Sequence, residues 1–219
     1  MFISLLVVGV FGLAAWVLLG SRLLVVRHVE VVGTHLLSRD RVVSVGQIRL
    51  GTPMIRLGAG AVRDRIAGIQ EVEEVRVERR WPTTVRIVVT ERVPVVVVPH
   101  GGKFEQYDKF GVLVLTSPAR PRALPDLVVA TPGPADAVTV AALTAWRSLP
   151  PRLVRRLTAV EAPTAESITF RLSGGRTIVW GAAERAQEKL RLIDALTRTA
   201  AGRSAQTIDV SSPEVVTTE

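Results

Sequence analysis

The sequence contains no cysteine, three histidines and few aromatic residues, and each shortage excludes a class of function. Without cysteine the chain has no disulfide bond, thiolate metal site or catalytic thiol. His28, His35 and His100 are scattered, no carboxylate cluster completes a metal site, and no Ser-His-acid order appears. Aromatic residues make up 5% of the chain, few for a nucleic-acid-binding surface. We therefore predict no catalytic residue, no cofactor-binding residue, no metal ligand and no nucleic-acid partner.

Acidic residues are also fewer than basic ones, 20 against 28, which gives a formal net charge of +8. Most arginines recur singly along predicted strands, with local clusters at Arg79-Arg80 and at Arg152, Arg155 and Arg156. General surface charge is the simplest interpretation of this excess. If the domain is exported, anionic lipid headgroups and cell-wall polymers are the alternative partners.

No charged side chain occurs in residues 2–20, and Arg22 is the first ionisable one. A helix of this length rises about 28 Å, close to the thickness of a bilayer core. The alternative is a secretory signal peptide, but residues 18–21 make a poor cleavage site and Arg22 follows at once. We predict an uncleaved membrane anchor. Its representative membrane-embedded residues are Phe2, Leu5, Val8, Phe11, Leu13, Trp16 and Leu19.

The orientation of this anchor stays open on sequence physics alone. Every lysine and arginine follows the apolar segment, which by the positive-inside rule would keep the bulk of the chain in the cytoplasm. Long domains, however, are translocated largely regardless of their charge.

Residues 25–91 predict the order strand, helix, helix, strand, strand. The first strand covers residues 25–32, and Ser38 is the N-cap of a helix that ends at residues 51–53. A second helix covers 58–68, and two strands flank the turn at 80–83. The predicted shared core consists of Val29, Val31, Val62, Ile66, Val75, Val77, Val85 and Ile87.

The rest of the chain is rich in strand-forming residues. Pro94 and Pro99 indicate that the strand at 93–98 lies at a sheet edge, and residues 117–134 are proline-rich and predict a loop. The other predicted elements are a hairpin turning at 108–111, a helix at 135–149, strands at 167–172 and 177–180, a helix at 182–201 ended by Gly202, and a final strand at 207–210.

Several of these segments resemble the FtsQ/DivIB family of bacterial cell-division proteins. They are residues 29–33, 51–57 and 75–94, of which the run from Arg79 to Pro94 is the most specific. Further similar positions are residues 108–111, 124–125, 174–176, 180–181 and Lys189. The likeness covers residues 1 to about 212 and is greatest to members from high-GC Gram-positive bacteria. The sequence departs from the family in lacking a basic cytoplasmic tail and in having no aromatic residues beyond Val210.

The resemblance implies an α+β protein made of an N-terminal transmembrane helix, a POTRA domain (β-α-α-β-β) and a second mixed β domain with flanking helices. The expected bounds are 1–21 for the anchor, 22–92 for the POTRA domain, 93–212 for the β domain and 213–219 for the tail. The N-terminus is expected in the cytoplasm and the bulk outside it, as a single-pass type II protein of the cell membrane at the division septum.

The function that the resemblance implies is a non-enzymatic scaffold linking early and late division proteins to septal peptidoglycan synthesis. Its expected partners are the small coiled-coil membrane proteins FtsB/DivIC and FtsL, together with FtsW and a septal penicillin-binding protein, in the lipid bilayer. POTRA domains and β domains with open edges bind by strand addition. The predicted partner-binding residues, at the final β segment and the tail, are Thr207, Ile208, Asp209, Val210, Val215, Val216 and Thr217.

Two alternatives belong to other classes. A POTRA-containing component of a protein assembly or secretion system needs many more membrane strands than the residues after Glu91 supply, since two helices are predicted there. A membrane-anchored cell-wall-binding protein is the other alternative. A cell-wall hydrolase would need a paired acid and base, and the sequence indicates none.

Overall fold

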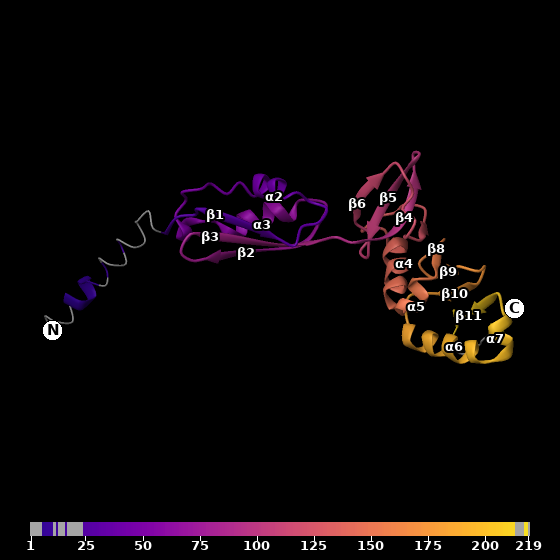
Figure 1. Cartoon of the computed structure of the whole chain (residues 1–219). Helices are drawn as coiled ribbons and strands as arrows, with labels where there is room; N and C mark the ends of the chain where they lie inside the picture. Colours follow the sequence, from indigo (N-terminus) through magenta and orange to yellow (C-terminus); the bar gives the residue numbers. More distant parts are fainter. Residues whose placement is uncertain (1–5, 11, 13–15, 17–23, 213–216, 219) are drawn as a thin grey trace. The chain divides into compact units, whose positions relative to one another are not determined.

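The computed structural model describes residues 6–10, 12, 16, 24–212, 217 and 218 (Figure 1). The chain divides into two compact units, the first through Arg92 and the second from Val93, called unit 1 and unit 2 below. Five of the predicted membrane residues, Phe2, Leu5, Phe11, Leu13 and Leu19, lie outside the described residues, while Val8 and Trp16 are described and exposed. Within the described ranges, no helix combines the length and apolar character that crossing a bilayer requires.

Unit 1 is a three-stranded sheet with two α-helices (Figure 1). Its elements are β1 (His28–Val32), α2 (Arg39–Gly46), the 3-10 turn η2 (Met54–Arg56), α3 (Ala59–Ala67), β2 (Val72–Arg80) and β3 (Thr84–Glu91). The strand order is β1-β3-β2, in which β3 runs parallel to β1 and antiparallel to β2. The predicted β-α-α-β-β order is confirmed.

Helix α2 begins as the sequence predicts and ends earlier. The Ser38 hydroxyl accepts a hydrogen bond from the Arg41 N–H at 3.2 Å, which satisfies one otherwise unpaired donor of the first turn. The helix stops at Gly46 because Gln47 takes a left-handed conformation and its N–H bonds to the Ser44 carbonyl. The expected end at residues 51–53 is therefore wrong.

The core of unit 1 lies between the sheet and the two α-helices. Six of the eight residues predicted for it are buried, and Val29 and Val77 are partly buried against the same cluster. The pairing of Val29 with Val85 and of Val31 with Ile87 brings the apolar positions of neighbouring strands to one face. The alternating pattern of each strand thus predicted the correct face.

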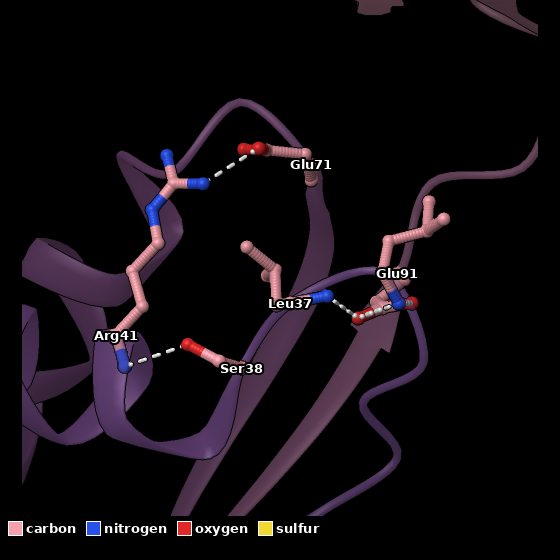
Figure 2. Close-up of polar contacts among 6 residues, drawn as sticks. Leu37, Ser38, Arg41, Glu71 and Glu91 are labelled. Carbon is pink, nitrogen blue, oxygen red and sulfur yellow. Dashed lines mark hydrogen bonds and ion pairs between the residues drawn. The ribbon is translucent and has the colours of Figure 1, made fainter.

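At the end of unit 1 where β3 stops, Glu91 holds the loop between β1 and α2 (Figure 2). Its carboxylate accepts hydrogen bonds from the backbone N–H groups of His35, Leu36 and Leu37 at 2.9, 2.8 and 2.8 Å. Partial burial raises the pKa of Glu91, but the three donors outweigh it and leave that pKa below its usual value. Nearby, the Arg41 guanidinium donates to the Glu71 carboxylate at 2.8 Å (Figure 2), which ties α2 to the residue preceding β2.

Unit 2 contains a mixed sheet whose described strands follow the order β12-β11-β10-β9-β8-β7-β4-β5-β6. In chain order they are β4 (Pro94–His100), β5 (Lys103–Asp108), β6 (Leu113–Ser117), β7 (Asp126–Val128), β8 (Leu157–Glu161), β9 (Ile168–Leu172), β10 (Thr177–Gly181), β11 (Thr207–Asp209) and β12 (Thr217–Thr218). The helices are α4 (Ala137–Ser148), α5 (Pro151–Val154), α6 (Ala186–Arg198) and α7 (Ala200–Ser204). Residues of α4 and α6 pack on a core that includes Phe170, Ile178 and Trp180.

Two predictions about the middle of this sheet are wrong. The strand expected at an edge, β4, lies between β7 and β5. Its prolines are tolerated because the pairing with β7 is confined to Val97 and Asp126, away from Pro94 and Pro99. The segment expected to be a loop contains β7, which also pairs in parallel with β8.

The hairpin predicted at residues 108–111 is confirmed, whereas the long helix after β10 is divided. The fully buried Asp108 carboxylate accepts bonds from the N–H groups of Phe110 and Val112, both at 2.8 Å, which fixes the turn. Thr199 ends α6 and caps α7, where its hydroxyl accepts from the Gly202 N–H at 3.0 Å. Gly202, predicted as a helix end, instead lies inside α7 against the Leu196 carbonyl.

Candidate partner-binding edge of unit 2

The final described strands build the candidate site at the outer edge of the sheet of unit 2. β11 runs parallel to β10, with Thr207 beside Thr177 and Asp209 beside Val179. The ladder continues beyond the strand, because the Val210 N–H donates to the Val179 carbonyl at 2.9 Å. On its other side β11 pairs with β12, which is antiparallel and two residues long.

The side chains of β11 alternate in exposure. Ile208 and Val210 are completely buried in the core, whereas Thr207 and Asp209 are half-buried. The core residues hold the strand in register, and the half-buried side chains lie on the other face of the sheet. The sequence predicts the four residues as one partner-binding group, but their burial divides them into two core residues and two half-buried ones.

The structure brings one predicted tail residue to this edge. Thr217 pairs with Asp209. Thr218, which is not among the partner-binding residues predicted from the sequence, pairs with Ile208. Val215 and Val216 lie outside the described residues.

The turn after β11 lies against the end of β10. The Ser211 N–H donates to the Asp209 carboxylate at 2.8 Å, which directs the chain out of the strand. Gly181 has a φ of 73°, and a Cβ atom on it would lie 2.8 Å from the Ser211 Cβ. This close approach explains why glycine follows Trp180 in the similar segment at residues 180–181.

A buried lysine fixes the helix that follows β10. Lys189, on α6, donates from Nζ to the carbonyls of Trp180 and Ala182 at 2.9 and 2.6 Å, and its Nζ lies 5.4 Å from the centre of the Trp180 ring. Burial is the main cause that lowers the pKa of this ammonium group; Glu184 opposes the shift and Arg185 adds to it. The sequence marked Lys189 only as a position similar to the family. The sequence alone does not predict its burial, because a lysine near the start of an amphipathic helix is usually exposed.

Other open edges exist in the described part of the chain. β2 is an outer strand of unit 1, and a hollow of about 530 Å³ lies between it and α3, lined in part by Gly60, Arg63 and Val75. Within the ranges that the structure describes, no group of three or more His, Asp or Glu side chains could hold a metal ion. The geometry at both edges suits backbone pairing with an extended peptide.

Comparisons with known proteins match both units. Residues 24–92 match the family model of the FtsQ-type POTRA domain, and residues 96–211 match that of the C-terminal part of the cell division protein FtsQ/DivIB. The cell division protein FtsQ of Streptomyces venezuelae is 32% identical over 220 residues, which cover 95% of this chain and 80% of that protein.

Mycobacterial proteins of the same name are also similar. FtsQ of Mycolicibacterium smegmatis is 40% identical over 192 residues, covering 87% of this chain and 56% of that protein. FtsQ of Mycobacterium leprae is 38% identical over 192 residues, covering 88% of this chain and 55% of that protein. The chain thus spans little more than half the length of these two relatives.

Proposed function

The chain belongs to the FtsQ/DivIB family of cell-division proteins, which are not enzymes, and on that premise we propose that it is a scaffold that receives a partner's strand at the β11–β12 edge. The scaffold is held in the cell membrane by residues 2–20, with its N-terminus in the cytoplasm and both units outside. The partner is an extended segment of an FtsB/DivIC-type membrane protein. FtsL, FtsW and a septal penicillin-binding protein belong to the same assembly.

The observation that carries this proposal is the short ladder between β11 and β12. It consists of two residue pairs, Ile208 with Thr218 and Asp209 with Thr217. A strand at the edge of a sheet presents backbone N–H and C=O groups that another chain can pair with. Backbone pairing supplies the affinity of such an interaction, and the side chains beside it supply the specificity.

The rest of the site is held in the core of unit 2. Buried Ile208 and Val210 fix β11 in the core, and Lys189 fixes α6 to the end of β10. A strand fixed in this way is already ordered before binding, so most of the ordering cost of strand addition falls on the partner.

Proline at Thr217 tests the proposal. Proline removes a backbone N–H and restricts φ, so it disturbs the edge strand whichever way that N–H points. We expect Thr217→Pro to weaken binding of the FtsB/DivIC-type partner more than tenfold, or about 1.4 kcal/mol. The measurement is a titration of the full chain in nanodiscs with the extracytoplasmic part of the partner.

Thr217→Ala is the matched control, because it removes the side chain but keeps the backbone donor, and its affinity should stay near that of the wild type. Deletion of residues 213–219 is a second comparison. Wild-type affinity for both Thr217→Pro and the deletion would place the site elsewhere. Tighter binding after the deletion would mean that β12 occupies the partner's own position on β11.

A further inference from the structure

One end of unit 1 is built from three segments that are far apart in the sequence, residues 24–28, 47–58 and 79–84. We call it the entry end, because β1 and β3 begin there and β2 finishes there. The Val26 N–H donates to the Thr52 carbonyl at 2.9 Å, and the Gly51 N–H donates to the Val26 carbonyl at 2.8 Å. The Arg27 N–H donates to the Thr83 carbonyl at 2.8 Å. Residues 26–27 are therefore bonded both to the loop at residues 47–58 and to the turn at residues 80–83.

Large apolar side chains are exposed on this end. Leu50, Ile55 and Trp81 have 66%, 54% and 54% of their surface exposed. An isolated exposed apolar side chain is ordinary. Here, however, the three side chains come from two connections, residues 47–58 and 80–83, that both bond to residues 26–27, and one of the three is a tryptophan.

Basic residues predominate at the entry end, and Glu78, at its border, pairs with Arg80. The three segments contain no aspartate or glutamate, and they contain Arg27, Arg49, Arg56, Arg79 and Arg80. Arg79 also donates to the Leu57 carbonyl at 2.6 Å, and Arg80 lies 3.4 Å from Glu78. The acidic residues Glu71 and Glu91 belong to the opposite end of the unit. The entry end is therefore basic and apolar together.

The chain itself keeps this end close to the predicted anchor. Val25 forms a β-bridge with Pro53, and Gly20 closes the apolar run of residues 2–20. Five residues span at most about 18 Å when fully extended. If residues 2–20 cross a bilayer, Val25 and the Pro53 bridged to it lie close to its surface.

We propose that the entry end of unit 1 is a membrane-contacting surface for anionic lipid, with Leu50, Ile55 and Trp81 entering the interface and the arginines facing phosphate headgroups. Tryptophan prefers the interface of a bilayer, and basic residues beside it are attracted to anionic lipids. A protein partner would also suit the apolar side chains. The lipid surface is favoured because basic side chains predominate around the patch and because the chain tethers it next to the predicted anchor. The inference rests on the membrane attachment proposed above.

The absence of native cysteine allows a clean test. The full chain, carrying Leu50→Cys with a fluorophore, is placed in liposomes of phosphatidylglycerol and phosphatidylcholine with brominated acyl chains. Leu36→Cys is the matched control, since Leu36 is 55% exposed and lies at the opposite end, where its N–H bonds to Glu91. We expect bromolipid quenching at position 50 and only background quenching at position 36.

Charge variants and liposomes of different composition test whether the contact depends on attraction between arginine and anionic lipid. Quenching at position 50 should fall with Arg56→Glu and in liposomes without the anionic lipid, and should be unchanged by Arg39→Glu on the exposed start of α2. Equal quenching at positions 50 and 36 would overturn the proposal. So would protection of position 50 from aqueous iodide without bromolipid quenching, because that result means protein covers it.

Flotation of the same liposomes tests membrane attachment separately from contact between the entry end and lipid. A chain that does not float contradicts the proposed membrane attachment. A chain that floats, with position 50 unquenched, contradicts only the contact of the entry end with lipid.

Discussion

At the scale of single residues, the Glu91 carboxylate fixes the loop between β1 and α2 to the end of β3. It collects three backbone N–H groups that follow one another, His35 to Leu37, and these donors precede α2 and have no helical carbonyl to bond. A charged acceptor in such a place forms stronger hydrogen bonds than a neutral one. The glutamate of the segment most similar to the family thus has a structural role in unit 1.

Replacing this carboxylate should destabilise unit 1 in a pH-dependent way. We expect Glu91→Gln to lower the free energy of unfolding by about 1–3 kcal/mol at pH 7, because the amide keeps one weaker acceptor. The pKa of Glu91 is lowered in the folded state. Its contribution is therefore fully present above the ordinary glutamate pKa of about 4.3 and is lost as the pH falls through the lower folded value.

The measurement is urea unfolding of the full chain, followed by a fluorophore on Ser44→Cys at the exposed surface of α2. The wild type and Glu91→Gln should differ at pH 7 and converge as the pH is lowered towards 3. A difference that persists unchanged at pH 3 would show that the hydrogen-bonded charge is not its source.

At the scale of elements, local chemistry predicted the parts whose signals lie within a few residues. The Ser38 cap and the Asp108 turn are examples, since each is made by a side chain bonding to its own neighbourhood. The sequence did not predict β7, because only Leu127 of its three residues is fully buried. The strand is held in place by its pairing with β4 and β8. Such pairing joins residues far apart in the sequence and leaves no local pattern.

The strand β3 offers a matched pair of substitutions on its two faces. Ile87 is fully buried, and the neighbouring Val88 is half-buried on the other face. Ile87→Ala should cost about 2–5 kcal/mol, a large part of the stability of a small domain. Val88→Ala should cost clearly less in the same Ser44→Cys unfolding experiment. Equal losses for the two variants would mean that the assignment of the core face is wrong.

At the scale of the whole molecule, the order of the two units could be predicted, but the state of the candidate edge could not. The alternating strands and the segments similar to the family predicted a POTRA-like unit followed by a β-rich one. That β12 pairs with β11 is set by the pairing of residues 208–209 with residues 217–218. The register of this pairing is not a local property of the tail sequence, which contains only short runs of β-branched residues.

The proposed topology predicts which side of the membrane the candidate edge faces. Ser212 is exposed, directly after the turn that follows β11. If both units lie outside the cytoplasm, Ser212→Cys should react with a membrane-impermeant thiol reagent in intact cells. Because the chain has no other cysteine, the labelling is specific. Labelling only after lysis would contradict the topology and, with it, the access of an external partner to this edge.

Strand addition at the β11–β12 edge is the central claim, and amide hydrogen exchange tests it most directly. The full chain in nanodiscs is compared with and without the extracytoplasmic part of the FtsB/DivIC-type partner. We predict slower exchange in peptides that contain Thr217–Thr218 when the partner is bound, because backbone N–H groups on the outer side of β12 become paired, and in peptides that contain Thr207–Asp209, because the added strand makes opening of the β11–β12 ladder rarer. Unchanged exchange in these peptides, together with slowing at another surface, would contradict the account.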